Sequence, residues 1–299
     1  MDVRLIGVPM DLGSDRRGVD MGPSAIRYAG LATAVETADH TCVDAGNLPV
    51  PGPETRDSAS GEYGDRAKFL AETREVCTTL SDAVQDTLAD GQFPLVLGGD
   101  HSIAIGSLGG AARDRDIGLV WFDAHGDYNT PSTTPTGNVH GMSLAATLGV
   151  DEFVGHDWAR SGIDPANTVL VGVRSLDGDE RDALAASEVT VYTMSDVDER
   201  GVPAVADEAF DIATDARDGF HVSLDMDFLD PDEAPGVGTP VRGGVTYREA
   251  HAAMEGVADH RDDLVSLEVV EVNPILDDHN RTAELAVELV ASALGKRIL

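Results

Sequence analysis

The chain has 299 residues and is 42% hydrophobic, which is enough to bury a substantial core and favours one domain spanning residues 1–299. Its 54 acidic residues outnumber 21 basic ones, giving a formal net charge of -33. This charge argues against nucleic acid as a partner, because phosphate contacts need Lys and Arg. The acids are spread among plentiful apolar residues, which favours an acidic surface over a disordered chain or an acidic tail. Molar salt screens such a surface, so we expect a halophilic source.

Three further features predict a cytoplasmic protein without membrane contact. The first residues form a short apolar run broken by charge, unlike a secretory signal peptide. No stretch reaches the roughly 18 apolar residues that a membrane-spanning helix needs. Cys42 and Cys77 have no CxxC spacing and no neighbouring histidine, which predicts two free thiols rather than a disulfide or a zinc site.

In chain order, short runs rich in Val, Ile and Leu alternate with longer stretches. The short runs predict strands at residues 4–8, 95–97, 118–122, 169–173, 189–193, 220–224 and 265–270. The longer stretches predict helices at residues 67–90, 102–113, 203–216, 247–258 and 281–293. Residues 51–65 are polar and rich in Pro and Gly, which predicts a loop. The alternation predicts a three-layer α/β/α fold with a mainly parallel central sheet and helices on both faces.

Polar residues with metal-binding chemistry follow three of the predicted strands. Two glycines precede Asp100 and His101 after the strand at 95–97, where the backbone can turn sharply. A lone histidine at a helix start is more often a surface or capping residue. Ligands of open parallel sheets nevertheless bind beyond the carboxyl ends of strands.

The other two strand ends carry aspartates in a period of two. Asp123, His125 and Asp127 follow one strand, and extended backbone would place the three side chains on one face. Asp225 and Asp227 follow another, and they repel each other unless a cation lies between them. The alternatives are an exposed polar loop and an acidic turn. Imidazole and carboxylate ligands without thiolate suit Mn(II), Fe(II), Co(II) or Zn(II), and the excess of carboxylates favours Mn2+.

These motifs resemble the signatures of the ureohydrolase family, which contains arginases and agmatinases. The three signatures are Gly-Gly-Asp-His-Ser at 98–102, Phe-Asp-Ala-His-Gly-Asp at 122–127 and Ser-Leu-Asp-Met-Asp at 223–227. The likeness covers essentially the whole chain. An Asn- and Thr-rich stretch at residues 127–141 resembles the arginase loop that holds the amino-acid end of the substrate, and the chain is most similar to the bacterial branch.

The resemblance implies two Mn2+ ions in each chain. One ion would be held by His101, Asp123, Asp127 and Asp225, and the other by Asp123, His125, Asp225 and Asp227. Asp123 and Asp225 would bridge the pair together with a hydroxide. A two-metal site of this kind acidifies a bridging water, and the hydroxide then attacks the guanidinium carbon of L-arginine to give L-ornithine and urea.

The resemblance also assigns catalytic and substrate-binding residues. Glu271 would pair with the guanidinium and His140 would shuttle protons, with Asp127 also counted as catalytic. The substrate-binding set would comprise His125, Asn129, Thr136, Asn138, Asp177, Thr239 and Glu271. Departures from the family pattern are Gly126, where some relatives have a hydroxyl residue, Thr136, where serine is common, and Phe228, where glycine is expected.

Several alternatives remain open at the level of sequence. The metal residues do not separate an arginase from a hydrolase of agmatine, guanidinobutyrate or formiminoglutamate, whereas residues 129–138 and Asp177 favour L-arginine. A non-catalytic acidic cation-binding protein is a second alternative, although histidines are poor ligands for calcium. A deacetylase of similar fold is remote, because no tyrosine is placed to polarise an amide. By analogy with the family we expect a homotrimer or homohexamer.

Overall fold

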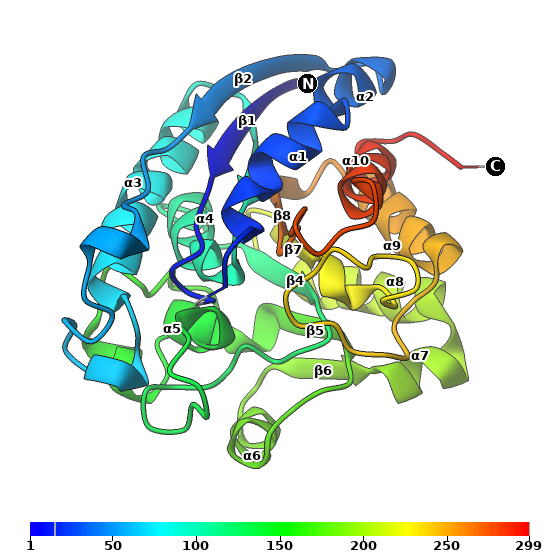
Figure 1. Ribbon diagram of the computed structural model, residues 1–299. Coiled ribbons are helices and arrows are strands. Elements are labelled where there is room, and N and C mark those ends of the chain that lie inside the picture. The colour runs from blue at the N-terminus through cyan, green and yellow to red at the C-terminus, as the bar shows by residue number, and fades with distance from the viewer. Residues whose placement is uncertain (15, 299) are drawn as a thin grey trace.

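The computed structural model describes residues 1–14 and 16–298 and has a parallel eight-stranded sheet at its centre (Figure 1). The strand order is β2-β1-β3-β8-β7-β4-β5-β6, and all neighbouring strands run parallel. The strands are β1 (Asp2–Val8), β2 (Thr41–Asn47), β3 (Phe93–Gly98), β4 (Gly118–Phe122), β5 (Thr168–Val173), β6 (Thr190–Thr193), β7 (Phe220–Asp225) and β8 (Leu264–Val270).

Helices cover both faces of this sheet, as predicted (Figure 1). The helices are α1 (Gly22–Tyr28), α2 (Leu31–Thr37), α3 (Leu70–Ala89), α4 (Ala104–Ala111), α5 (Ser143–Leu148), α6 (Gly178–Ala186), α7 (Met194–Arg200), α8 (Val202–Ala213), α9 (Tyr247–Asp259) and α10 (Arg281–Ala293). One core cluster joins the sheet to α1, α2, α8, α9 and α10, and a second joins it to α3, α4 and α5. The three-layer α/β/α prediction is therefore confirmed.

The alternation of side chains along each strand produces these two clusters. In β4, Val120 and Phe122 enter the first cluster, while Leu119 and Trp121 enter the second. Because successive strand residues point to opposite faces, a strand buried on both sides is a continuous apolar run. That pattern is what made the central strands recognisable in the sequence.

All seven predicted strands are present, with ends that shift by up to two residues, and all five predicted helices are present. The sequence analysis missed β2, α1, α2, α5, α6 and α7. Both cysteines are free, as predicted. Among the residues that the structure describes, no helix is both long and apolar enough to cross a membrane.

The strand order determines which segments meet at the carboxyl edge of the sheet. Strands β3, β8, β7, β4 and β5 are consecutive neighbours, although they are widely separated along the chain. The segments after β3, β7 and β4 carry the three predicted motifs, and the segment after β8 begins with Glu271. The predicted site residues therefore converge at the centre of one edge.

Candidate metal centre and substrate cavity

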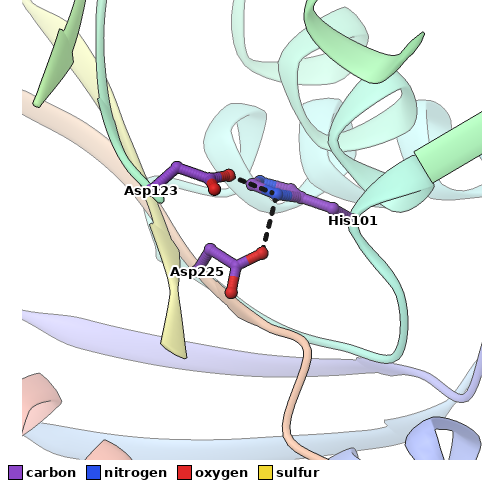
Figure 2. A group of neighbouring side chains, drawn as sticks. All are labelled: His101, Asp123 and Asp225. Carbon is purple, nitrogen blue, oxygen red and sulfur yellow. Dashed lines mark ion pairs between the residues drawn. The ribbon is translucent and has the colours of Figure 1, made fainter. Parts of the chain in front are cut away.

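The six predicted metal ligands lie together, and five of them form two groups that are able to hold a cation. His101, Asp123 and Asp225 make one group, shown in Figure 2, and Asp123, His125 and Asp227 make the other. Within each group the ligand atoms lie within 4.8 Å of one another. Asp123 belongs to both groups, so the two sites are adjacent.

The distances around His101 fit a divalent cation. Its Nδ1 lies 3.1 Å from one carboxylate oxygen each of Asp123, Asp127 and Asp225. One imidazole proton cannot serve three acceptors at once, and Nδ1 makes no hydrogen bond of good geometry. Metal–ligand bonds of about 2.1 Å at right angles place neighbouring ligand atoms about 3 Å apart. The spacing is that of ligands around a shared ion.

The second group has a similar geometry. Nδ1 of His125 lies 3.0 Å from Oδ2 of Asp227 and 3.4 Å from Oδ1 of Asp123. Burial, and then the charges of Asp227 and Asp123, raise the pKa of Asp225 well above its usual value. Burial and Asp123 likewise raise the pKa of Asp227. Carboxylates that destabilise one another in this way are stabilised by divalent cations, so the residues fit a metal pair.

Two side chains that the sequence analysis missed orient His101 and Asp123. The Trp121 ring stacks on the His101 ring at a centroid distance of 4.1 Å, and its Nε1 donates a 2.9 Å hydrogen bond to Asp123. Nε2 of His101 lies 2.7 Å from Oγ of Ser223, which leaves Nδ1 facing the carboxylates. Such outer contacts fix the tautomer and the orientation of a ligating histidine. Trp121 and Ser223 each precede an aspartate ligand by two residues, and this period-two spacing is the signal that identifies them.

Asp127 and Glu271 both have backbone in the left-handed region, which is rare for residues other than glycine. Their φ angles are 48° and 65°, respectively. The carbonyl of Asp127 accepts hydrogen bonds from the amides of Leu144 and Ala145, and the amide of Glu271 donates to Gly99. Strained backbone of this kind persists where surrounding contacts hold it, and it clusters at functional sites.

His140, which is partly exposed, and the buried Glu271 form a pair beside the first cation group. Nδ1 of His140 lies 3.0 Å from Oε1 of Glu271, and the same oxygen accepts a hydrogen bond from the amide of His101 at 2.9 Å. Burial alone lowers the pKa of His140, but the hydrogen bond and charge of Glu271 outweigh it and raise that pKa to about 9. His140 is therefore a proton donor at neutral pH.

A cavity of about 250 Å³ opens over the cation groups. Its walls include seven predicted substrate or catalytic residues: His125, Asp127, Asn129, Thr136, His140, Asp177 and Thr239. The predicted metal ligand Asp225 also reaches it. Two predicted residues, Glu271 and Asn138, are not in the wall. Glu271 lies behind His140. The side-chain amide of Asn138 donates to the Ser14 carbonyl and accepts from the Lys68 ammonium.

Glu180 is a further carboxylate in the cavity wall that the sequence analysis missed. Its Oε1 accepts a hydrogen bond from the amide of Tyr128 at 3.0 Å, and burial raises its pKa to about 7. Asp177 caps α6 by accepting from the amide of Glu180, and its other oxygen accepts from Nδ2 of Asn129 at 2.8 Å. The available signal was the Asp-x-x-Glu spacing at a helix start.

Phe228, which departs from the family pattern, lies in the core rather than in the cavity. The side chain is fully buried, and its ring lies 5.2 Å from that of Phe122. It covers Gly172, whose φ is +98° and where a Cβ atom would lie 2.4 Å from the Phe228 ring. Glycine at 172 therefore makes room for the phenylalanine.

Comparison with known proteins agrees with this geometry. The chain matches the arginase family over residues 1–295. It is 47% identical to an arginase of Bacillus caldovelox, with 99% of each chain covered. The crystal structure of arginase from Bacillus subtilis has a TM-score of 0.90 at 46% identity and covers 100% of both chains. The native Bacillus caldovelox structure has a TM-score of 0.92 at 46% identity, covering 100% of this chain and 99% of that one. The chain therefore belongs to the arginase family.

Proposed function

We propose that this protein is an arginase that hydrolyses L-arginine to L-ornithine and urea. The observation that carries the proposal is a pair of cation groups sharing Asp123 beneath a cavity lined by amino-acid-binding side chains. The high identity to proteins named arginase from Bacillus caldovelox and Bacillus subtilis supports it. The same sequence similarity supports a bacterial-type arginase.

The cations that we propose are two Mn2+ ions in each chain, because the ligand set is rich in carboxylates and has no thiolate. One ion is assigned to His101, Asp123, Asp127 and Asp225, and the other to Asp123, His125, Asp225 and Asp227. When bound, a pair of divalent cations supplies Lewis acidity and makes water nucleophilic near neutral pH. The chain itself contributes the orientation of the ligands and the water-poor surroundings.

The cavity wall provides complementary groups for the amino-acid end of the substrate. Asn129 and Thr136 are placed to donate hydrogen bonds to an α-carboxylate, and Asp177 is placed to accept from an α-amino group. Nδ2 of Asn129 donates to Asp177, so the two residues hold each other in position. We assign supporting roles to His125, Thr239 and Asn138, the last acting from behind the wall. The guanidinium is then directed towards the cation groups.

His140 and Glu271 handle charge and protons during the reaction. Glu271 offsets the positive charge of the guanidinium, and its Oε1 is held by the His101 amide and by His140. Because the pKa of His140 is raised to about 9, its ring carries a proton that it can give to the departing amine. His140 lines the cavity, and from there it exchanges its proton with solvent.

Urea release from L-arginine and from agmatine, measured side by side after manganese loading in molar KCl, tests the proposal. Agmatine lacks the α-carboxylate, so Asn129 and Thr136 give the enzyme a preference for L-arginine. Greater turnover of agmatine would make the protein an agmatinase and overturn the assignment of this wall. Two tightly bound transition ions without urea from either substrate would indicate a different guanidino substrate, and calcium alone would indicate a cation-binding protein.

We further propose that residues 1–299 form one catalytic domain that acts in the cytoplasm of a halophile as a homotrimer or homohexamer. The acidic charge supports the salt-rich setting. Exposed apolar side chains support assembly, since Tyr28 is 89% exposed and Ile275 is 63% exposed. Light scattering in molar KCl tests the assembly, and a monomer would contradict it.

A further inference from the structure

Arg174, the first residue after β5, binds the backbone of the loop that carries Asp227. Its guanidinium donates to the carbonyls of three consecutive residues, Asp227 at 2.6 Å, Phe228 at 3.2 Å and Leu229 at 3.1 Å. It also donates to the Gly172 carbonyl at 3.2 Å and to the Val241 carbonyl at 2.9 Å and 3.3 Å. One side chain thus connects the ends of β5 and β7 with the segment around residue 241.

The arrangement is unusual because the guanidinium faces carbonyls rather than a carboxylate. Among the described residues, no carboxylate lies within ion-pairing distance of Arg174. Three successive carbonyls that converge on one point repel one another unless a cation with several donors lies there. The planar guanidinium of arginine is always charged and supplies five N–H donors. The compact ammonium of lysine is also charged but supplies only three donors.

The backbone of Arg174 also contacts the segment that carries the other ligands of the second cation group. The amides of Arg174 and Ser175 donate to the carbonyl of Ala124 at 2.9 Å and 3.0 Å. Ala124 lies between Asp123 and His125, and its own amide donates to Oδ1 of Asp227. Arg174 therefore connects the backbones on both sides of the group formed by Asp123, His125 and Asp227.

We propose that Arg174 is a positioning residue for the second cation group, holding Asp227 at the separation from His125 that a divalent ion requires. The proposal rests on the assignment of a metal pair made above. The first group is less dependent on Arg174, because His101 is held by Trp121 and Ser223 instead. Loss of the guanidinium fork should therefore weaken one metal site much more than the other.

The variants that test this are Arg174→Met, which removes both the charge and the fork, and Arg174→Lys, which keeps the charge. The control is Arg217→Met, which removes an exposed arginine whose partner is Asp116. Manganese binding is measured by equilibrium dialysis and metal analysis on chelator-treated protein in molar KCl. Electron paramagnetic resonance distinguishes a coupled manganese pair from a single ion.

We expect the wild type and Arg217→Met to bind two ions per chain with a coupled-pair spectrum. Both Arg174 variants should keep the first ion and lose about 10–100-fold in affinity for the second, the range seen when an outer contact to a metal ligand is removed. If Arg174→Met does not fold, Arg174→Lys decides the matter. Wild-type affinity for both ions in a folded Arg174→Lys, or equal weakening of both sites, would overturn the proposal. A wild type that binds no manganese pair would instead overturn the proposed function.

Discussion

Replacing Glu271 by Gln tests the pair that we place at the centre of proton handling. The substitution keeps the size of the side chain and an oxygen that accepts from the His101 amide, but it removes the negative charge beside Nδ1 of His140. Without that charge, burial lowers the pKa of His140 and only the charges of Asp127 and Asp100 oppose it, so the pKa falls below the wild-type value. His140 in the variant therefore loses its proton at a lower pH than in the wild type.

The size of the effect follows from the pKa of His140. The shift from 6.5 to about 9 is roughly 2.5 units, and at 1.36 kcal/mol per unit it corresponds to about 3 kcal/mol of stability, to which Glu271 contributes most and Asp127 and Asp100 the rest. Because the folded-state pKa is raised, this stability is fully present below about pH 6.5 and is lost as the pH rises through 9. Burial raises the pKa of Glu271, but the hydrogen bond and charge of His140 outweigh burial and lower that pKa. The shifts of Glu271 and His140 arise from the same interaction, so its energy is counted only once.

Thermal unfolding of chelator-treated protein between pH 6 and pH 10 measures this difference. In a chain of this size, 3 kcal/mol corresponds to about 5 °C in Tm. We expect Glu271→Gln to unfold that much earlier than the wild type at pH 6 and to approach it above pH 9. Glu208→Gln is the control, since its partner Arg200 does not titrate in this range. A Tm difference that stays constant from pH 6 to pH 10 would refute the reasoning.

Two further substitutions address catalysis and specificity. His140→Asn should reduce kcat for L-arginine by about 100-fold, because general acid catalysis typically contributes this much. The manganese content should not change. An unchanged kcat would show that His140 takes no part in proton transfer. Asn129→Ala should raise KM for L-arginine by about tenfold, because one hydrogen bond to a charged group contributes about 1.5 kcal/mol or more. Agmatine kinetics should change less, and an equal effect on both substrates would show that Asn129 does not recognise the carboxylate.

The sequence predicted the central strands and the metal ligands for the same physical reason. Strands buried on both faces are apolar runs, so an aspartate at the end of such a run stands out, as Asp123 and Asp225 do. The parallel sheet then brings those ends to one edge. This rule needs no knowledge of distant contacts and pointed to the aspartates and to His125, whereas His101 was assigned by the resemblance to the ureohydrolase family; all six residues lie together at that edge.

The features that were missed depend on contacts between distant segments or carry little local signal. Strand β2 lies at the sheet edge with most of its residues exposed, so its side chains show no apolar run. Helix α6 buries only Glu180 and Leu184, and its weak pattern hid the cavity residue Glu180. The contacts of Arg174 with residues 227–229 and 241 span more than 50 positions, and no local pattern predicts them.

The two sources of electrostatic repulsion in this protein differ in how they respond to salt. Repulsion among surface carboxylates acts through water, and molar KCl shortens the Debye length to about 3 Å and screens it. Repulsion among Asp123, Asp127, Asp225 and Asp227 acts between buried side chains, where salt screens charges much less than at the surface, so a bound cation relieves it most. We therefore expect KCl to raise the Tm of the chelator-treated protein, and manganese to raise it further at every KCl concentration.

A Tm that KCl leaves unchanged would remove the support for a halophilic source. Molar KCl that abolished the manganese effect would show that the cluster is open to solvent, and the aspartates would then be surface carboxylates rather than a preformed metal centre.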